Sequence, residues 1–280
     1  MFKINEIYNE DCLKFIDKID DYSIDVLISS PPYNTSISRP QNKKEEDIEK
    51  GKTKIRKHSY NRYDLDIDSK SETQYAEWVR DIFKGMENKL KPNGIIAWNV
   101  SYGVSTDNSG EDNINNSTWL SLLYIITETD FTLCDYICWY KSNAIPLSIG
   151  NKLSRICEPV FIFCRKSEVN TYHVNHDPQK RRGGSPYINE YENLVSTRLN
   201  NDEICEYNSA TYPSELVEKI INLYAPKKAL IFDPFMGTGT TAVGCIETGN
   251  NYIGSELSAN QYEWTKRRIR NLKNQSLWFR

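Results

Sequence analysis

The sequence lacks the tight cysteine and histidine pairs that close a structural metal site. Seven Cys and three His are scattered through 280 residues. Cys134 and Cys138 lie in a strand-like run with no matching pair nearby, and His173 and His176 lie in a different, polar segment. Structural zinc needs four ligands at closely paired spacings. We therefore expect no bound metal.

Long apolar runs are also absent, and neither charge dominates. Residues 1–12 are polar and lack the apolar core of a secretory signal, and no stop-transfer segment follows. With the scattered cysteines, this predicts a reduced, cytoplasmic protein without a membrane partner. The formal net charge is -3, so contact with nucleic acid would need local basic clusters. Two clusters are present, at residues 39–62 and 179–184, and each taken alone is typical of a solvated loop.

The overall composition is that of a globular protein. Hydrophobic residues make up 39% and charged residues 26%, as in ordinary soluble proteins, and the length suits one large α/β domain or a domain with a smaller appendage. Apolar segments alternate with amphipathic ones, which predicts a parallel sheet with helices on both faces. Strands are expected at 5–9, 24–30, 95–100, 131–141, 158–166, 229–232 and 251–257, and helices at 12–19, 74–90, 214–225, 242–249 and 260–273.

The sequence allows more specific predictions for three regions. The helix at 74–90 has a continuous apolar stripe, and Ser71 and Gln74 are spaced as a capping box before it. The strands at 131–141 and 158–166 would form an antiparallel edge hairpin. Periodicity is lost from 167 to 208, which indicates a long functional loop or a small separate lobe.

One stretch with the character of a nucleotide pocket follows a predicted strand, "DPFMGTGTT" at 233–241. Its glycines allow a ligand to approach the backbone, and the following helix offers free N–H groups. A P-loop would need a Lys before the Thr pair, and a dinucleotide fingerprint would want a third glycine where Ala242 stands, so a structural turn is also open. Glu256, at the end of the next strand, could accept hydrogen bonds from two ribose hydroxyls. Asp233 could meet a cationic amino group, and S-adenosylmethionine has both features.

The other stretch is "SPPY" at 30–33, which ends a strand abruptly because proline cannot continue a sheet ladder. A plain strand-ending turn is the alternative. For an exocyclic amine on a nucleobase, the Ser30 hydroxyl and the Pro31 carbonyl would accept the amine hydrogens and localise the nitrogen lone pair. Tyr33 offers a flat face for an extruded base. Such catalysis is mainly positioning and electrostatics, and needs no strong base if the proton leaves after methyl transfer.

These two motifs resemble those of the amino-methylating DNA methyltransferases. "SPPY" is similar to their catalytic motif and "DPFMGTGTT" to their S-adenosylmethionine motif, and the catalytic motif comes first, as in the permuted β group. The resemblance implies a Rossmann-like methyltransferase sheet with helices on both faces and a small target-recognition region. It divides the chain into a catalytic half at 1–166 with an inserted loop at 35–70, a target-recognition region at 167–208, and a cofactor-binding half at 209–280.

The resemblance also implies roles for single residues. Asp11 in "NEDCLKF" is similar to the acidic residue that meets the cofactor adenine, and "WYKSNAIP" is similar to the segment that lines the target-base pocket. Tyr212 stands where many relatives carry His. The implied catalytic residues are Ser30, Pro31, Pro32 and Tyr33; the implied cofactor-binding residues are Asp11, Asp233, Pro234, Phe235, Gly237, Thr238, Gly239, Thr240 and Glu256; the implied DNA contacts are Asn34, Lys141, Asn143, Lys180, Arg181 and Arg182.

The expected reaction is methylation of double-stranded DNA. In the family, Ser at the first motif position usually accompanies N4 of cytosine, whereas Asn34 after Tyr33 resembles the adenine-type pattern, so adenine N6 is the alternative. Lys180, Arg181 and Arg182 suit phosphates or guanine edges. The short recognition region predicts a short target site and a homodimer or helper subunit, and a restriction-modification setting would add a cognate endonuclease. An RNA or protein-glutamine methyltransferase would usually carry the motifs in the opposite order, and an inactive DNA-binding subunit is the remaining class.

Overall fold

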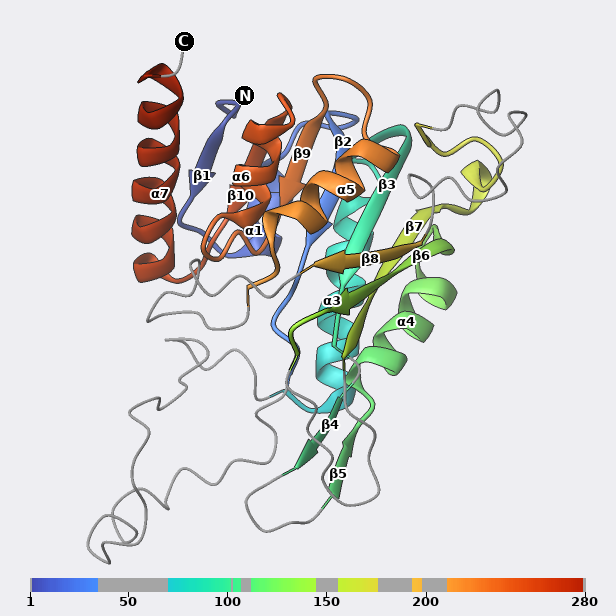
Figure 1. The fold of residues 1–280 in the computed structure, drawn as a ribbon. Coiled ribbons are helices and arrows are strands. Elements are labelled where there is room, and N and C mark those ends of the chain that lie inside the picture. The colour runs from blue at the N-terminus through green and yellow to red at the C-terminus, as the bar shows by residue number, and fades with distance from the viewer. Residues whose placement is uncertain are drawn as a thin grey trace, which may run out of the picture.

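The computed structural model describes residues 2–34, 70–101, 103–106, 112–144, 156–175, 193–197 and 211–278. These residues are organised around an eight-stranded sheet (Figure 1). Its first five strands in spatial order are parallel, β7 is antiparallel to both neighbours, and β8 is parallel to β6. The order is β1 (Glu6–Tyr8), β10 (Asn251–Ser255), β9 (Leu230–Asp233), β2 (Ile24–Ser29), β3 (Leu90–Asn99), β7 (Cys157–Arg165), β6 (Phe131–Lys141) and β8 (Leu194–Thr197).

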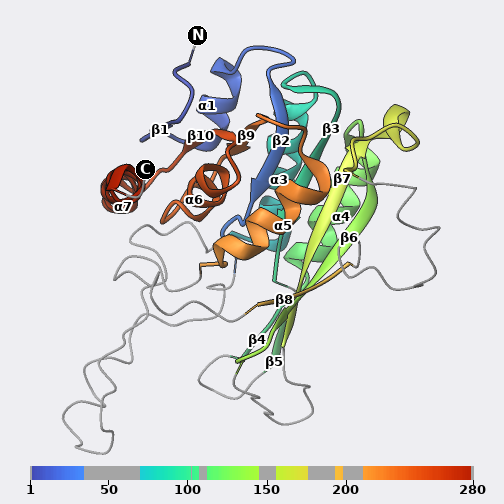
Figure 2. The same ribbon diagram turned by 45° about the horizontal axis from the view of Figure 1, so that its top comes forward.

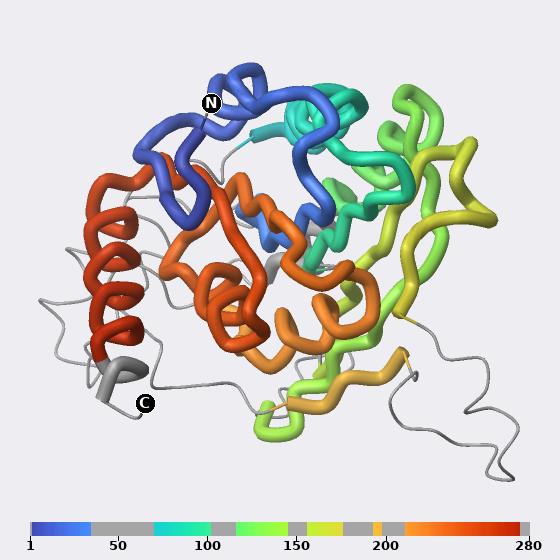
Figure 3. The backbone as a smooth tube through the Cα atoms, turned by 90° about the horizontal axis from the view of Figure 1, so that it is seen from above, coloured from blue at the N-terminus to red at the C-terminus, as the bar shows by residue number. Residues whose placement is uncertain are grey.

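Helices cover both faces of the sheet, as the alternation of segments predicts. One face buries α1 (Cys12–Lys18), α3 (Glu72–Met86) and α4 (Ser117–Glu128) in an aromatic core. The other face buries α5 (Ser214–Tyr224), α6 (Thr240–Glu247) and part of α7 (Ala259–Trp278). Figure 3 shows the blue and cyan helices on one side of the sheet and the orange and red helices on the other. No helix in the described part of the chain is long and apolar enough to cross a bilayer.

The predicted elements form with small shifts at their ends. Helix α3 begins with the capping box, in which the Ser71 hydroxyl accepts from the Gln74 amide and the Gln74 side chain accepts from the Ser71 amide. The helix ends at Met86 because the chain already enters β3 at Leu90. Strands β6 and β7 pair antiparallel, as predicted. The sheet continues past β6, because Leu194 to Thr197 add a parallel strand along its outer edge.

Helix α4 and the strands β4 (Gly103–Thr106), β5 (Asp112–Asn115) and β8 have no counterpart in the sequence-based expectation. Helix α4 lies between β3 and β6, and a two-stranded ribbon, β4 with β5, follows β3. Strand β8 comes from the segment expected to be a loop or lobe. Its pairing with β6 places part of the predicted target-recognition region in the main sheet.

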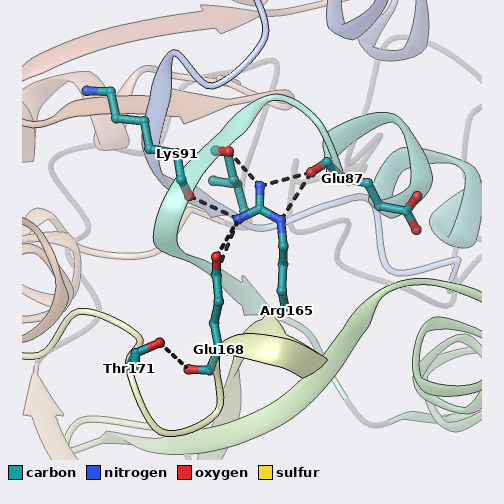
Figure 4. Close-up of polar contacts among 6 residues, drawn as sticks. Glu87, Lys91, Arg165, Glu168 and Thr171 are labelled. Atoms are coloured by element: carbon teal, nitrogen blue, oxygen red, sulfur yellow. Dashed lines mark hydrogen bonds and ion pairs between the residues drawn. The ribbon is translucent and has the colours of Figure 1, made fainter.

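Arg165, the last residue of β7, connects this strand to the end of α3 and the start of β3 (Figure 4). The guanidinium of Arg165 donates to the backbone carbonyls of Glu87, which follows α3, and of Leu90 and Lys91, the first two residues of β3. It also forms an ion pair with Glu168. The Glu87 carbonyl, at the end of the helix, has no partner within the helix, so Arg165 satisfies it while joining β7 to α3 and β3.

Candidate active site

The two predicted motifs meet at the carboxyl ends of neighbouring strands. The "SPPY" turn directly follows β2, "DPFMGTGTT" begins at the last residue of β9, and the two strands are hydrogen-bonded neighbours (Figure 2). Their ends are also tied by side chains, because the buried Ser29 hydroxyl donates to Asp233 Oδ1 at 2.5 Å. In open α/β sheets, ligands bind outside the carboxyl ends of the strands. The sheet order therefore brings together motifs that lie about 200 residues apart in the sequence.

The Ser30 hydroxyl belongs to a directed chain of hydrogen bonds. The Tyr33 hydroxyl donates to Asn99 Oδ1 at 2.9 Å, and Asn99 Nδ2 donates to the Pro159 carbonyl at 3.2 Å. A tyrosine hydroxyl has one hydrogen. In the 2.7 Å contact between Ser30 Oγ and Tyr33 Oη, the serine must therefore be the donor. The chain turns the Ser30 proton toward Tyr33 and leaves the lone pairs of Ser30 Oγ as acceptors.

The two prolines of the turn are buried and rigid. The Tyr75 hydroxyl, from α3, donates to the Pro32 carbonyl at 2.8 Å. Within the described residues nothing donates to the Pro31 carbonyl. The turn thus keeps two acceptors, Ser30 Oγ and the Pro31 carbonyl, close together in the sequence, while Asn99 and Tyr75 hold its two ends.

Asn34 is fully buried and joins the two ends of the chain that flank residues 35–69. Its Nδ2 donates to the Lys70 carbonyl at 2.7 Å and to Ser117 Oγ at 3.0 Å, and its Oδ1 accepts from the Lys70 amide at 2.9 Å. Its backbone φ is 55°, a conformation that Asn tolerates better than most residues. The predicted base contact of Asn34 stays a prediction, since its amide is engaged by the protein here.

The glycine loop between β9 and α6 is connected to the acidic residue at the end of β10. Gly237 and Gly239 have φ values of 54° and 86°, which side chains with a Cβ rarely adopt. The Gly237 amide donates to Glu256 Oε2 at 2.8 Å, and the Ser258 amide donates to Glu256 Oε1 at 2.8 Å. Each carboxylate oxygen can accept more than one hydrogen bond, so Glu256 can hold the loop and still accept from a ligand.

Asp233 is the centre of a buried polar cluster. Besides Ser29, its carboxylate accepts from the Thr241 hydroxyl, from the Phe235 amide at 2.9 Å and from the Tyr212 hydroxyl at 3.4 Å. Burial raises the pKa of Asp233 above its ordinary value, although the bonds from Ser29 and Thr241 act in the opposite direction. Burial, and then the nearby Asp233, also raise the pKa of Tyr212 well above its usual range. The Tyr212 hydroxyl also contacts the Thr241 hydroxyl and so closes this cluster.

The loop residues fit a ligand that offers hydrogen-bond acceptors. Thr238 is 2% exposed, and its Oγ1 has no hydrogen-bond partner among the described residues. A buried hydroxyl without a partner costs free energy unless something binds it. Beside it, Phe235 is half-buried and packs against Trp78 and Trp98 with ring centroids 5.3 Å and 6.1 Å away. Pro234 is also fixed, because its carbonyl accepts from the Ser255 hydroxyl at 2.9 Å.

Asp11 lies just beyond the end of β1, next to the end of β10. Its Oδ1 caps α1 by accepting from the amides of Leu13 and Lys14 at 3.1 Å and 3.2 Å. The nearby Asn9 donates to the Glu256 carbonyl at 2.8 Å. The backbone around Asp11 and that around Glu256 are therefore connected through Asn9.

The predicted DNA contacts are only partly described. Lys141, at the end of β6, forms an ion pair with Glu158 of β7 and lies over the Trp139 ring, 4.6 Å from its centroid. Asn143 is exposed just beyond it. Lys180, Arg181 and Arg182, together with the basic cluster at 39–62, lie outside the described residues.

Sequence reasoning missed the residues that hold the motifs from a distance. Asn99, at the end of β3, and Tyr75, on α3, each contact the turn at residues 30–33. Asn99 carries the one available signal, because a polar residue ends an otherwise apolar buried strand next to β2 in the sheet. Tyr75 gives no signal, since it occupies a position of the apolar helix stripe.

Comparison with known proteins identifies the family. The Type II methyltransferase M.HinfI of Haemophilus influenzae is 23% identical over 276 residues, covering 96% of this chain and 69% of that protein. M2.MboI of Moraxella bovis is 25% identical over 275 residues, covering 94% and 86%. The solved PvuII DNA methyltransferase (cytosine-N4-specific) has a TM-score of 0.67 at 16% identity, covering 95% and 86%.

A second solved structure is TTHA0409 of Thermus thermophilus, a putative DNA modification methylase complexed with S-adenosyl-L-methionine. Its TM-score is 0.61 at 16% identity, covering 94% of this chain and 92% of that one. Both structural likenesses confirm the Rossmann-like methyltransferase fold. Residues 24–267, which include both motifs and every strand from β2 to β10, match the DNA methylase family N6_N4_Mtase, and the chain belongs to this family.

Proposed function

We propose that the protein transfers a methyl group from S-adenosylmethionine to the exocyclic N4 amine of a flipped cytosine in double-stranded DNA. Membership of the DNA methylase family supports the reaction class. The observation that carries the proposal further is the directed hydrogen-bond chain from Ser30 through Tyr33 to Asn99. It makes Ser30 Oγ an acceptor, which is the role that an amine substrate needs.

In this proposal the catalytic turn prepares the amine for attack. Ser30 Oγ and the Pro31 carbonyl accept the two amine hydrogens, which draws the nitrogen toward tetrahedral geometry and localises its lone pair. The Tyr33 ring stacks on the extruded base. The new N–C bond forms as the S–C bond of the sulfonium breaks, S-adenosylhomocysteine leaves, and the nitrogen then loses one proton to solvent. The rate gain comes from positioning and electrostatics.

S-adenosylmethionine supplies the activated methyl group. The residues proposed to hold it are those around the glycine loop and the ends of β1 and β10. Glu256 would accept from the ribose hydroxyls and Asp11 would meet the adenine. The unpartnered Thr238 hydroxyl supports this assignment. Asp233, Pro234, Phe235, Gly237, Gly239 and Thr240 complete the proposed pocket.

Adenine N6 is the second candidate substrate, because Asn34 follows Tyr33 as in the adenine-type motif. The contacts of Asn34 with Lys70 and Ser117 favour a structural role for this residue, which leaves Ser30 as the feature that favours cytosine. The proposed division of the chain keeps 167–208 as the target-recognition region, with Lys180, Arg181 and Arg182 on DNA. A homodimer and a cognate restriction endonuclease are part of the same proposal.

Nucleoside mass spectrometry tests the function directly. Plasmid DNA free of methylated bases is incubated with the purified chain and S-adenosylmethionine, with the Tyr33→Ala variant as a control for contaminating methyltransferases. N4-methylcytosine is expected with the wild-type chain and not with the variant. N6-methyladenine would overturn the choice of base while leaving the reaction class intact. Cofactor binding without methylation of any DNA would instead favour an inactive DNA-binding subunit.

A further inference from the structure

Helix α7 contacts the glycine loop through two of its side chains. The Thr265 hydroxyl donates to the Gly237 carbonyl at 2.6 Å, and Thr265 is completely buried. One turn further, Arg268 Nη1 donates to the Thr238 carbonyl at 2.9 Å and lies 3.4 Å from Thr240 Oγ1. Two consecutive carbonyls of the loop are therefore held by two side chains of one helix.

Holding these carbonyls fixes the direction of the amides that share their peptide planes. In a trans peptide the C=O and the N–H point in opposite directions. With the Gly237 carbonyl held by Thr265, the Thr238 amide points away from α7. In the next peptide, the carbonyl is held by Arg268 and the Gly239 amide donates to the Met236 carbonyl at 2.8 Å. The protein therefore holds the carbonyl of the first peptide, and both the carbonyl and the amide of the second.

Helix α7 packs so closely against the loop that only glycine fits at position 239. A Cβ placed on Gly239 would lie 2.5 Å from Thr265 Cγ2. The helix is itself anchored near its start, because the Gln261 amide donates to the buried Ser258 hydroxyl at 3.2 Å. Since Ser258 also donates its amide to Glu256, the same short segment fixes the helix and the acidic residue.

The locked geometry leaves Thr238 with two groups that the protein does not use. Its hydroxyl is buried without a partner, and no described residue accepts from its amide. Two unpaired donors in a buried loop are costly unless a ligand accepts from them. Because Thr265 holds the Gly237 carbonyl, the Thr238 amide in the same peptide cannot turn toward the helix.

We propose that Thr265 and Arg268 are positioning residues that lock the glycine loop so that the amide and hydroxyl of Thr238 are presented to S-adenosylmethionine. The inference rests on the proposed function and assigns to α7 a part in cofactor binding. Neither residue touches the cofactor in this account. They act through the two carbonyls, and the loop would lose its preformed shape without them.

Thr265 allows a test that separates the hydrogen bond from packing. Thr265→Val keeps the shape and removes the hydroxyl, whereas Thr265→Ser keeps the hydroxyl and removes the methyl group. Titration calorimetry with S-adenosylmethionine should give a dissociation constant about 5- to 10-fold higher for Thr265→Val, as for one lost hydrogen bond. Thr265→Ser should stay within about 2-fold of the wild type. Equal losses in both variants would overturn the hydrogen-bond role.

Arg268 provides a second test on a residue that is only partly buried. Arg268→Met should weaken cofactor binding by about 10-fold or more, because the lost donor is charged, while the KM for DNA changes little. Arg267→Met and Arg270→Met remove the same charge from exposed positions of α7 and should bind the cofactor as the wild type does. Wild-type affinity in Arg268→Met would overturn the positioning role. A wild-type chain that binds no S-adenosylmethionine would overturn the proposed function as well, so the two failures are distinguishable.

Discussion

The Tyr33 hydroxyl donates a hydrogen bond to the side-chain oxygen of Asn99, 2.9 Å away, and so joins the turn at residues 30–33 to the end of β3. This contact decides the direction of the bond between Ser30 and Tyr33: the serine donates, and its lone pairs stay available as acceptors. The tyrosine therefore has two proposed tasks: its ring stacks on the base and its hydroxyl orients Ser30. The two tasks can be separated by mutation.

Tyr33→Phe keeps the ring and removes the hydroxyl. We expect kcat to fall about 3- to 10-fold, the worth of one hydrogen bond, with an unchanged dissociation constant for S-adenosylmethionine. Tyr33→Ala should abolish turnover and also leave cofactor binding nearly intact. Tyr136→Phe, at an exposed position of β6, is the control. A Tyr33→Phe enzyme as fast as the wild type would show that the hydroxyl does not orient Ser30.

Glu256→Gln tests the proposed ribose contact. The amide keeps one acceptor oxygen and loses the charge, so the binding free energy of S-adenosylmethionine should weaken by about 1.5 to 3 kcal/mol. Calorimetric titration measures this change. The control is Glu247→Gln, which removes the same charge from an exposed position of α6 and should leave the affinity unchanged. Unchanged affinity in Glu256→Gln would mean that the ribose lies against other residues.

Asn34→Gly tests whether this residue joins the chain or reads the base. The substitution removes three hydrogen bonds while tolerating the positive φ, and we expect the free energy of unfolding to fall by about 1–3 kcal/mol in urea titrations. Ser117→Ala, which removes one of the three bonds, should lose less. The methylated base should be the same in both variants. A changed base with unchanged stability would point to direct contact with DNA.

The raised pKa of Asp233 predicts an unusual dependence of stability on pH. Because the folded-state pKa lies above the ordinary value of 3.8, the folded chain binds this proton more tightly than the unfolded chain does. The contribution of Asp233 to stability is therefore complete below 3.8 and is lost as the pH rises through the folded-state pKa. In urea unfolding, the stability of the wild type relative to Asp233→Asn should increase as the pH falls toward about 4. A difference that decreases on acidification would contradict the assignment.

Arg165→Met should affect stability and leave the chemistry alone. It leaves the carbonyls of Glu87, Leu90 and Lys91 without their donor, so we expect a loss of about 3 kcal/mol in the free energy of unfolding. Arg80→Met, which removes an arginine held mainly by ion pairs on the surface, should cost about 1 kcal/mol or less. Cofactor affinity should be unchanged in both. Weaker cofactor binding in Arg165→Met would show that the two ends of the sheet are coupled.

The sequence predicts the parallel sheet because its strands are apolar throughout and its helices have clear stripes. It does not predict α4, whose apolar residues surround the helix: Trp119 and Leu123 are exposed while Ile125 is buried. Strand β8 is four residues long in a polar segment, so its periodicity is too short to detect. Its pairing depends on the edge that β6 offers.

The residues of the site can also be divided into those that the sequence reveals and those that it does not. Ser30 and Asp233 stand out because prolines and glycines mark a special turn at a strand end, and the fold brings the two motifs together as the resemblance implies. Asn99, Tyr75, Thr265 and Arg268 could not be found in the sequence, because each acts through a contact with a residue far along the chain. The roles assigned to single residues stay predictions until the variants above are measured.

The position of β1 at the outer edge, next to β10 alone, has a consequence for how the chain is made. Residues 6–8 leave the ribosome before every other strand of the sheet, yet their partner strand at 251–255 emerges after all the others. At about 5–20 residues per second, this interval is on the order of tens of seconds. During that time the first strand has no place in the sheet, so the growing protein completes the proposed cofactor pocket only after the last strand has been synthesised.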